Sequence, residues 1–394
     1  MTWRRAVLGT VLMALLASGP RGSAWAAPAR SVARLPAPHP PALIETPYHG
    51  SPDRIVIGGH GELRFAEDRE DGVSNPDWFS VGRVNGFIFA RLHPRLDAAA
   101  QACWDRGADD FVMERAEILF RASPSIRAHA GIFLAPLGRT NLSHDAPPYD
   151  FAERSLVATQ LIGVPNAQLG VGVLGVRPSR NASRISYEVD LVTGYDDGLV
   201  MDSPGGTRVP RGRNNYGDNN GLPSIVWRVA RSSSPGKEIG LAAQSGQYNK
   251  TMLNGVRVDD PRWVHVVVAD GVTQVAGFSV SGEAAAALID VPPGLRALFS
   301  EQQYGASVEV VRTLFGPILR GWKASSLTAA LRADAVDFDR KIQGDSRSRI
   351  SASLNIHSRP LAVTRFGWYY EIRRDRFNNE TPLAGVTLTA ATYF

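Results

Sequence analysis

Hydrophobic and polar residues alternate with a period of two in short segments that recur from Arg54 to the end of the chain. In the stretch RISYEVDLVTG, Ile185 and Val189 hold one parity, and Glu188 and Asp190 hold the other. Such alternation predicts β-strands with one apolar and one polar face. We expect sixteen strands, at residues 55–66, 82–93, 95–103, 111–122, 125–134, 167–176, 183–194, 222–231, 237–248, 262–269, 272–281, 304–315, 323–337, 347–357, 361–373 and 383–394.

The connections between these strands are alternately short and long. Short ones fall at residues 93–94, 123–125, 177–182, 232–236, 270–271, 316–322 and 358–360, and longer ones lie between them, notably 135–166, 195–221, 249–261 and 282–303. Short turns that alternate with long loops are typical of outer-membrane barrels, in which the turns face the periplasm. The pattern predicts an all-β, transmembrane antiparallel β-barrel with extracellular loops and both chain ends on the periplasmic side. A soluble β-sandwich, whose strands would also alternate, is the alternative.

The first 26 residues predict a signal peptide of the Sec type. Arg4 and Arg5 precede the apolar run AVLGTVLMALLA, and Ala24-Trp25-Ala26 supplies the small residues of a cleavage site. Residues 27–53 are rich in proline and lack alternation, so we expect a flexible segment before a barrel domain at 54–394. After the leader, no apolar run is long enough for a membrane-spanning helix.

The charge of the chain does not indicate a nucleic-acid partner. The sequence has 43 basic and 38 acidic residues, and three of the basic residues lie in the leader, so an excess of two remains. Only Lys237, Lys250, Lys323 and Lys341 are lysines. Arginine stays charged and binds oxyanions with a planar fork, although a GC-rich genome would produce the same bias without selection for chemistry.

The last strand predicts a surface in contact with lipid. One parity carries apolar side chains and ends in Phe394, while the other carries small or polar residues: Val386, Leu388, Ala390, Thr392 and Phe394 against Gly385, Thr387, Thr389 and Ala391. Together with the leader and the alternation, this ending resembles Gram-negative outer-membrane porins. The resemblance implies that Phe394 belongs to the signal read by the barrel-assembly machinery.

The run from Glu114 to Val157 resembles the phosphate-selective porin O and P type. The elements that carry the likeness are Gly131, Phe133, Pro136 and Gly138 at a strand end, and Glu153-Arg154-Ser155-Leu156 in the loop that follows. The resemblance implies a channel in the outer-membrane lipid, usually a homotrimer, that passes small anions or other small polar solutes by diffusion without a cofactor. Four scattered lysines depart from the lysine cluster of a strongly phosphate-selective pore.

The longest early loop is the candidate pore constriction. We expect the segment 137–165 to fold inward because Pro147-Pro148 stiffens it, with a solvated outside cap as the alternative. Its cations are Arg139 and Arg154, and its counter-charges are His144, Asp145, Asp150 and Glu153. Neighbouring strands place further charges at inward parity: Arg115, Glu117, Arg121, Arg127, His129, Arg228, Arg332, Arg365 and Arg373.

These arginines have two interpretations. Rows of arginine opposite carboxylates would create a transverse field that favours anions. Alternatively, Arg and Glu on adjacent strands pair across the ladder and stiffen the wall.

Other functions have weaker support. A barrel enzyme of the lipase or protease type would use a Ser/His or Asp/His pair, but the eight histidines are scattered and neither G-x-S-x-G nor H-E-x-x-H occurs. A structural or adhesive barrel is a further alternative. Cys103, the only cysteine, cannot form an intramolecular disulfide and is expected to be a structural thiol, so we expect no metal site. The sequence favours a diffusion channel with a mild anion preference and no catalysis.

Overall fold

The computed structural model describes residues 55–105, 110–145, 147–178, 183–201, 206–213, 216–218, 220–234, 236–359 and 362–394. The expected signal peptide at 1–26 and the proline-rich segment at 27–53 lie outside the described residues.

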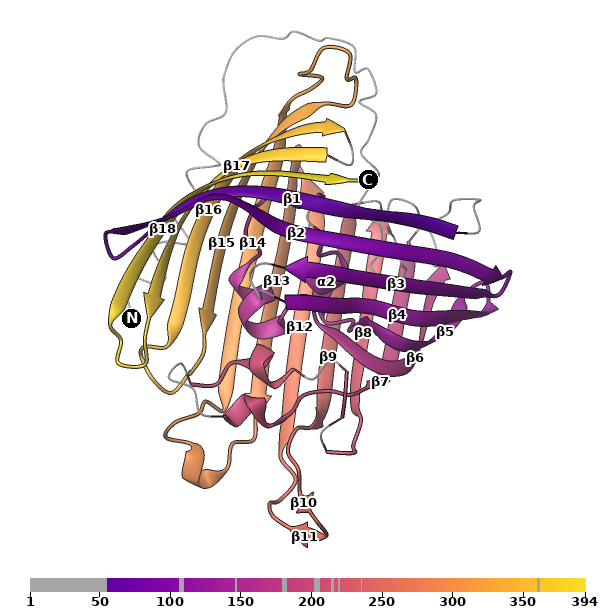
Figure 1. Ribbon diagram of the computed structural model, residues 1–394, viewed down its shortest axis with the longest axis vertical. Helices are drawn as coiled ribbons and strands as arrows, with labels where there is room; N and C mark the ends of the chain where they lie inside the picture. Colours follow the sequence, from indigo (N-terminus) through magenta and orange to yellow (C-terminus); the bar gives the residue numbers. More distant parts are fainter. Residues whose placement is uncertain are drawn as a thin grey trace. The chain divides into compact units, whose positions relative to one another are not determined.

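Within the described residues, sixteen antiparallel strands close into one barrel in which β1 pairs with both β2 and β18 (Figure 1). Fifteen of the expected strands each correspond to one strand of the barrel, whereas 272–281 spans the end of β12 and the start of β13. The fold prediction is confirmed and the sandwich is excluded. The strands are β1 (Ile55–Glu70), β2 (Val73–His93), β3 (Leu96–Asp105), β4 (Asp110–Ser123), β5 (Ile126–Leu134), β6 (Ala167–Pro178), β7 (Arg184–Val192), β8 (Ser224–Ser234), β9 (Lys237–Gln247), β12 (Trp263–Val275), β13 (Phe278–Ile289), β14 (Gln302–Phe315), β15 (Ser326–Asp337), β16 (Ser346–Arg359), β17 (Ala362–Arg374) and β18 (Glu380–Tyr393).

Short elements lie in the connections. They are α2 (Gly138–Leu142), the π-helix η1 (Ala158–Ile162), the 3-10 helices η2 (Asp197–Val200), η3 (Val209–Gly212) and η4 (Pro293–Leu295), and the small hairpin of β10 (Met252–Leu253) and β11 (Val256–Arg257). Among the described residues, no helix is long and apolar enough to cross a membrane.

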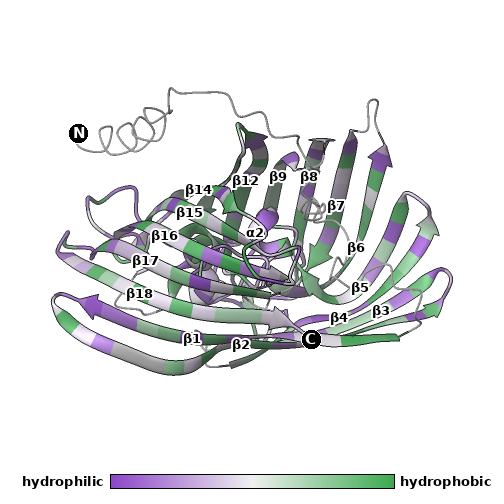
Figure 2. Cartoon of the chain, turned by 90° about the horizontal axis from the view of Figure 1, so that it is seen from above, coloured by the Kyte–Doolittle hydropathy of each residue, from purple (hydrophilic) through white to green (hydrophobic). Residues whose placement is uncertain are grey.

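The two faces of the wall differ in polarity, as the alternation predicts for most strands. On β16, Ile350 is 40% exposed on the outside whereas its neighbour Ser351 is 4% exposed on the inside. On β18, Leu388 is 48% exposed and Thr389 is 1% exposed. Hydrophobic and hydrophilic bands alternate along the strands in Figure 2. The exposed outer face is therefore apolar, which suits contact with lipid.

Two adjacent strands break this rule. Val264, Val266 and Val268 of β12 point inward and are almost fully buried, while Val267 of the same strand is exposed on the outside. The opposing strand β13 contributes Ala285, Ala287 and Ile289 to the same buried apolar cluster. The expectation of one wet face on every strand is wrong for β12 and β13, because other segments of the chain cover their inner faces.

The expected alternation of short and long connections holds for part of the barrel, and three connections depart from the expected positions or lengths. The connection after β1 is a two-residue turn at Asp71 and Gly72, with φ of 46° and 84°, so the expected long loop is part of the strands. The turn between β12 and β13 lies at Ala276 and Gly277 rather than at residues 270–271. Positive φ at both turn residues is the conformation that tight hairpins favour. The connection between β14 and β15 spans residues 316–325, longer than expected.

The end of the chain completes the barrel seam. The backbone N–H of Phe394 donates to the carbonyl of Gly59 at 2.9 Å, and the N–H of Gly59 donates to the carbonyl of Phe394 at 3.0 Å. The residue Phe394 is 66% exposed. Its backbone is therefore fixed to β1, while the ring remains accessible.

Candidate functional site

The connection between β5 and β6, residues 135–166, lies inside the barrel, and we call it the inward segment. Its helix α2 contacts β9, β12 and β13, and η1 contacts β13 and β14. Its other half is bound to side chains of β15, β16 and β17. Figure 2 shows α2 within the ring of strands. The segment therefore crosses the interior between two different parts of the wall.

One part of the wall holds the inward segment by apolar packing. Leu137, Leu161 and Ile162 of the segment are at most 1% exposed and join the cluster that contains the inner residues of β12 and β13. Phe338, which follows β15, and Tyr195, which follows β7, belong to the same cluster. Burial of a leucine side chain contributes about 1.5–3 kcal/mol, so this packing is a substantial anchor.

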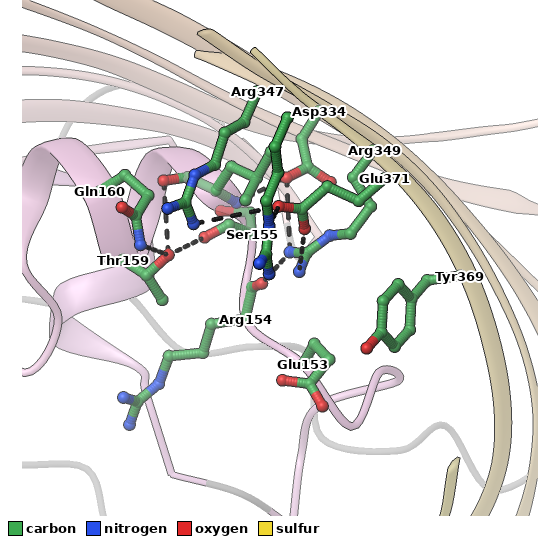
Figure 3. A network of polar contacts seen from close by, with 12 residues as sticks. Glu153, Arg154, Ser155, Thr159, Gln160, Asp334, Arg347, Arg349, Tyr369 and Glu371 are labelled. Carbon is green, nitrogen blue, oxygen red and sulfur yellow. Dashed lines mark hydrogen bonds and ion pairs between the residues drawn. The ribbon is translucent and has the colours of Figure 1, made fainter. Parts of the chain in front are cut away.

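The opposite part of the wall holds the inward segment with guanidinium groups. Arg332 Nη1 donates to the carbonyl of Glu153 at 2.9 Å, and Arg365 Nε donates to the carbonyl of Tyr149 at 2.7 Å. Arg349 donates to the carbonyl of Arg154 (Figure 3). Three arginines from three neighbouring strands thus satisfy backbone acceptors that would otherwise be buried without partners.

Glu153 adds a charged contact to this side. Its carboxylate forms an ion pair with Arg64 of β1. Burial would raise the pKa of Glu153, but the nearby Arg64, Arg349 and Arg332 outweigh burial and hold the pKa below its usual range. Glu153 is therefore an anion at neutral pH.

Asp150 is also an anchor of the inward segment. Its Oδ1 accepts hydrogen bonds from Asn355 Nδ2 at 3.1 Å and from Thr328 Oγ1 at 3.3 Å. His357 Nε2 lies 3.6 Å from the same oxygen. The carboxylate ties the segment to β15 and β16.

The two arginines of the inward segment lie in different surroundings. Arg154 is 8% exposed, and its Nη1 donates to the carbonyl of Val164 at 3.0 Å within the segment itself. Figure 3 shows its side chain turned away from Arg347 and Arg349. Arg139 lies in the last turn of α2 and is half-buried. Their roles in a constriction stay predictions.

The expected wall residues are at different levels of the barrel. Arg115 Nη1 lies 3.0 Å from Glu117 Oε1 in the middle of β4, and Glu117 Oε2 lies 3.2 Å from His129 Nδ1. Arg121 and Arg127 face each other across the ladder beside the short turn at 124–125. The structure therefore does not bring Arg121 and Arg127 to the inward segment.

The inward-facing arginines are paired with carboxylates, often across an intervening strand. Arg228 of β8 donates to Asp270 of β12 at 2.6 Å, although β9 lies between these strands. Arg365 of β17 donates to Glu62 of β1 at 3.3 Å across β18. Further pairs are Arg121 with Asp97, Arg332 with Asp334, and Arg373 with Glu371. These pairs agree with the wall-stiffening interpretation. Among the described residues, Arg121 pairs with an adjacent strand, and so do Arg228, with Glu238 of β9 at 3.5 Å, and Arg332, with Glu309 of β14 at 3.4 Å.

A cavity of about 260 Å³ lies between Glu153 and the wall. Its lining is almost entirely polar: Arg64, Asp68, Glu70, Asn75, Glu153, Arg349, Tyr369, Glu371, Arg373 and Leu383. Arg64, Arg349 and Tyr369 were missed as site residues. Each has the inward parity of its strand, so the alternation contained the signal for them.

The architecture matches solved barrels although the sequences have diverged. OprB of Pseudomonas putida superposes with a TM-score of 0.56 at 10% identity, covering 86% of this chain and 94% of that one. OmpF of Salmonella typhi gives 0.55 at 11% identity, covering 86% and 97%. An anion-selective porin from Comamonas acidovorans gives 0.53 at 12% identity, covering 86% and 99%.

This is the fold of outer-membrane porins. No protein-family model and no curated protein sequence matches the chain. The likeness to the porins therefore concerns the fold.

Proposed function

We propose that this protein is an outer-membrane porin, a water-filled channel through which small hydrophilic solutes diffuse passively. The observation that carries the proposal is the inward segment, which is held inside a closed sixteen-stranded barrel by Arg332, Arg349 and Arg365. A barrel of this size encloses an aqueous channel, and a segment fixed across the interior narrows it. The apolar outer face supports insertion into the outer membrane.

We further propose a weak anion preference. Arginine is the only strong cation of the wall interior, because Lys237, Lys250, Lys323 and Lys341 are all exposed and lie in the connections or at a strand end. The carboxylates beside the arginines offset most of their charge, so we expect a chloride-to-potassium permeability ratio above one and below about ten, a difference under about 1.4 kcal/mol. The proposal does not extend to phosphate, since the exposed lysines form no cluster inside.

Planar bilayer recordings of the purified protein test both statements. Stepwise conductance increases are expected on addition of protein, and a reversal potential of anion-selective sign is expected in a potassium chloride gradient. Absence of conductance steps from folded, inserted protein would refute the channel. Clear cation selectivity would refute the charge argument and leave the channel intact.

Two properties implied by the porin resemblance complete the proposal. The protein assembles as a homotrimer, which electrophoresis without heating in mild detergent tests as a band that converts to the monomer on boiling. The accessible ring of Phe394 serves the assembly machinery, so Phe394→Ala lowers the amount of folded barrel in the outer membrane while leaving conductance per channel unchanged.

A further inference from the structure

A group of histidines and carboxylates joins the inward segment to the wall opposite β12. His144 and Asp145 of the segment meet Glu114 of β4, with one ligand atom from each residue within 4.8 Å of the others. His60 of β1 lies beside them, with its Nε2 at 3.4 Å from Asp145 Oδ1. His60, Glu114 and His144 are at most 4% exposed. We call these four residues the His60–Asp145 cluster.

A β-bulge places Glu114 in this cluster. In the pairing of β3 with β4, Gln101 lies opposite Arg115 and Ala102 lies opposite Met113, so Glu114 has no partner in the ladder. The extra residue shifts the parity of β4, and both Glu114 and Arg115 are turned from the lipid face. Bulges redirect side chains in this way and are common next to functional sites.

Hydrogen bonds orient three of the four residues. His144 Nδ1 lies 3.0 Å from the carbonyl of Asn141, which only accepts, so Nδ1 carries the proton and Nε2 presents its lone pair in the neutral ring. Glu114 Oε2 accepts from Asn85 Nδ2 at 3.0 Å and from Gln101 Nε2 at 2.9 Å. Asp145 Oδ2 accepts from Tyr393 at 2.8 Å. Supporting contacts of this kind orient metal ligands in proteins.

The atoms that face the centre of the cluster lack hydrogen bonds. His144 Nε2 and Glu114 Oε1 lie 2.9 Å apart, yet among the described residues neither makes a hydrogen bond with acceptable geometry. Buried polar atoms without hydrogen bonds destabilise the folded protein. A shared cation would satisfy both.

We propose that the His60–Asp145 cluster binds a divalent transition-metal ion of the zinc class. Imidazole nitrogen and carboxylate oxygen are zinc ligands, at about 2.0–2.2 Å, and an imidazole ligand disfavours calcium and magnesium. His144 Nε2, Glu114 Oε1 and a carboxylate oxygen of Asp145 supply three ligands, and His60 orients the Asp145 carboxylate through its Nε2. The ion ties the inward segment to β1 and β4, across from its apolar anchor.

A second group of histidine and carboxylates has no histidine nitrogen that lacks a hydrogen bond. His129, Glu188 and Asp190 also offer close ligand atoms. However, His129 Nδ1 faces Glu117 Oε2 at 3.2 Å, and its Nε2 faces Asp190 Oδ1 at 2.9 Å. Both His129 nitrogens already make hydrogen bonds to carboxylates, unlike His144 Nε2, so no lone pair of His129 is available for a metal.

Zinc titration of the purified barrel in detergent, after treatment with a chelator, tests the proposal independently of channel activity. One equivalent of zinc per chain is expected to bind. His144→Asn and Glu114→Gln are expected to weaken binding at least about tenfold, since each removes a ligand. His357→Asn is the matched control, because His357 also joins the inward segment to the wall but through Asp150 alone.

The outcomes separate cleanly. Absence of zinc binding by the wild-type barrel, unchanged binding in both ligand variants, or equal loss in His357→Asn would overturn the proposal. Zinc K-edge absorption gives a second measurement that does not require a loss of binding. One imidazole ligand, from His144, is expected in the wild-type protein and in His60→Asn, and absence of an imidazole ligand would overturn the proposal.

Discussion

The inward segment is held by two parts of the wall that use different physical interactions. Toward β12 and β13 the contact is apolar, with Leu161 and Val266 among fully buried side chains. Toward β15, β16 and β17 it consists of arginines that donate to backbone carbonyls. Apolar packing is non-directional and carries no field, whereas the arginines fix geometry and charge together. Substitutions on the apolar side should therefore change only the stability of the barrel. Substitutions on the arginine side should change stability, pore width and ion selectivity.

The largest effect is expected on the arginine side. Arg332→Met removes a guanidinium that contacts the carbonyl of Glu153 and the carboxylate of Asp334, and it leaves the buried Asp334 with Arg349, at 3.5 Å, as its remaining cation. We expect a loss of about 3–5 kcal/mol of unfolding free energy. Urea titration followed by the gel mobility of the folded barrel measures it, and bilayer recordings should give larger conductance steps.

Arg373→Met is the control for this substitution. Its guanidinium is partly exposed and pairs with Glu371 at 2.8 Å. Pairs of this kind contribute at most about 1 kcal/mol. Equal destabilisation by the two variants would contradict the distinction between the buried Arg332 and the partly exposed Arg373.

The second effect concerns the apolar side. Leu161→Ala creates a cavity between η1 and β14, and we expect a loss of about 2–5 kcal/mol with an unchanged reversal potential. Leu388→Ala, on the outer face, serves as the comparison. A change in ion selectivity in Leu161→Ala would show that the two sides are not separable.

The lowered pKa of Glu153 makes the docking of the inward segment sensitive to acid. A carboxylate whose pKa is lowered by docking stabilises the docked segment above its ordinary pKa of about 4.3, and this contribution is lost as the pH falls below that value. Conductance should be constant from about pH 8 to pH 5 and should change below about pH 4. Glu153→Gln should show the acid conductance at every pH, and a transition near neutral pH would refute the assignment.

The smallest effects are expected for the arginines of the segment itself. Arg139→Ala and Arg154→Ala should shift the reversal potential toward cations, by about twofold in permeability ratio, or roughly 0.4 kcal/mol. Because Arg154 donates to the carbonyl of Val164, its variant should also increase current noise. If neither variant moves the reversal potential, the segment's cations play no part in selectivity.

Sequence reasoning succeeded where the determining interaction is local. Alternation located every strand but β13, whose expected range began within β12, and it included 95–103, whose alanines also suit a helix. It misplaced the turn at Asp270 and Gly271, a pair typical of turns, because the ladder of β12 with β13 continues to Val275 and Phe278. There the register of the sheet overrides the local turn preference, and Asp270 instead pairs with Arg228 inside the barrel.

The sequence by itself determined the number of strands, most of their positions and the apolar outer face, because a period of two reports directly on which face each side chain occupies. Only the tertiary structure decided which part of the barrel interior is packed with apolar side chains and which part is lined by charged ones. The inward segment reaches Asp334 and Asn355 across some two hundred residues, and a bulge at Glu114 reverses the parity on which any such inference rests. Contacts between residues so distant in the chain depend on register and closure, and neither is encoded in the local alternation.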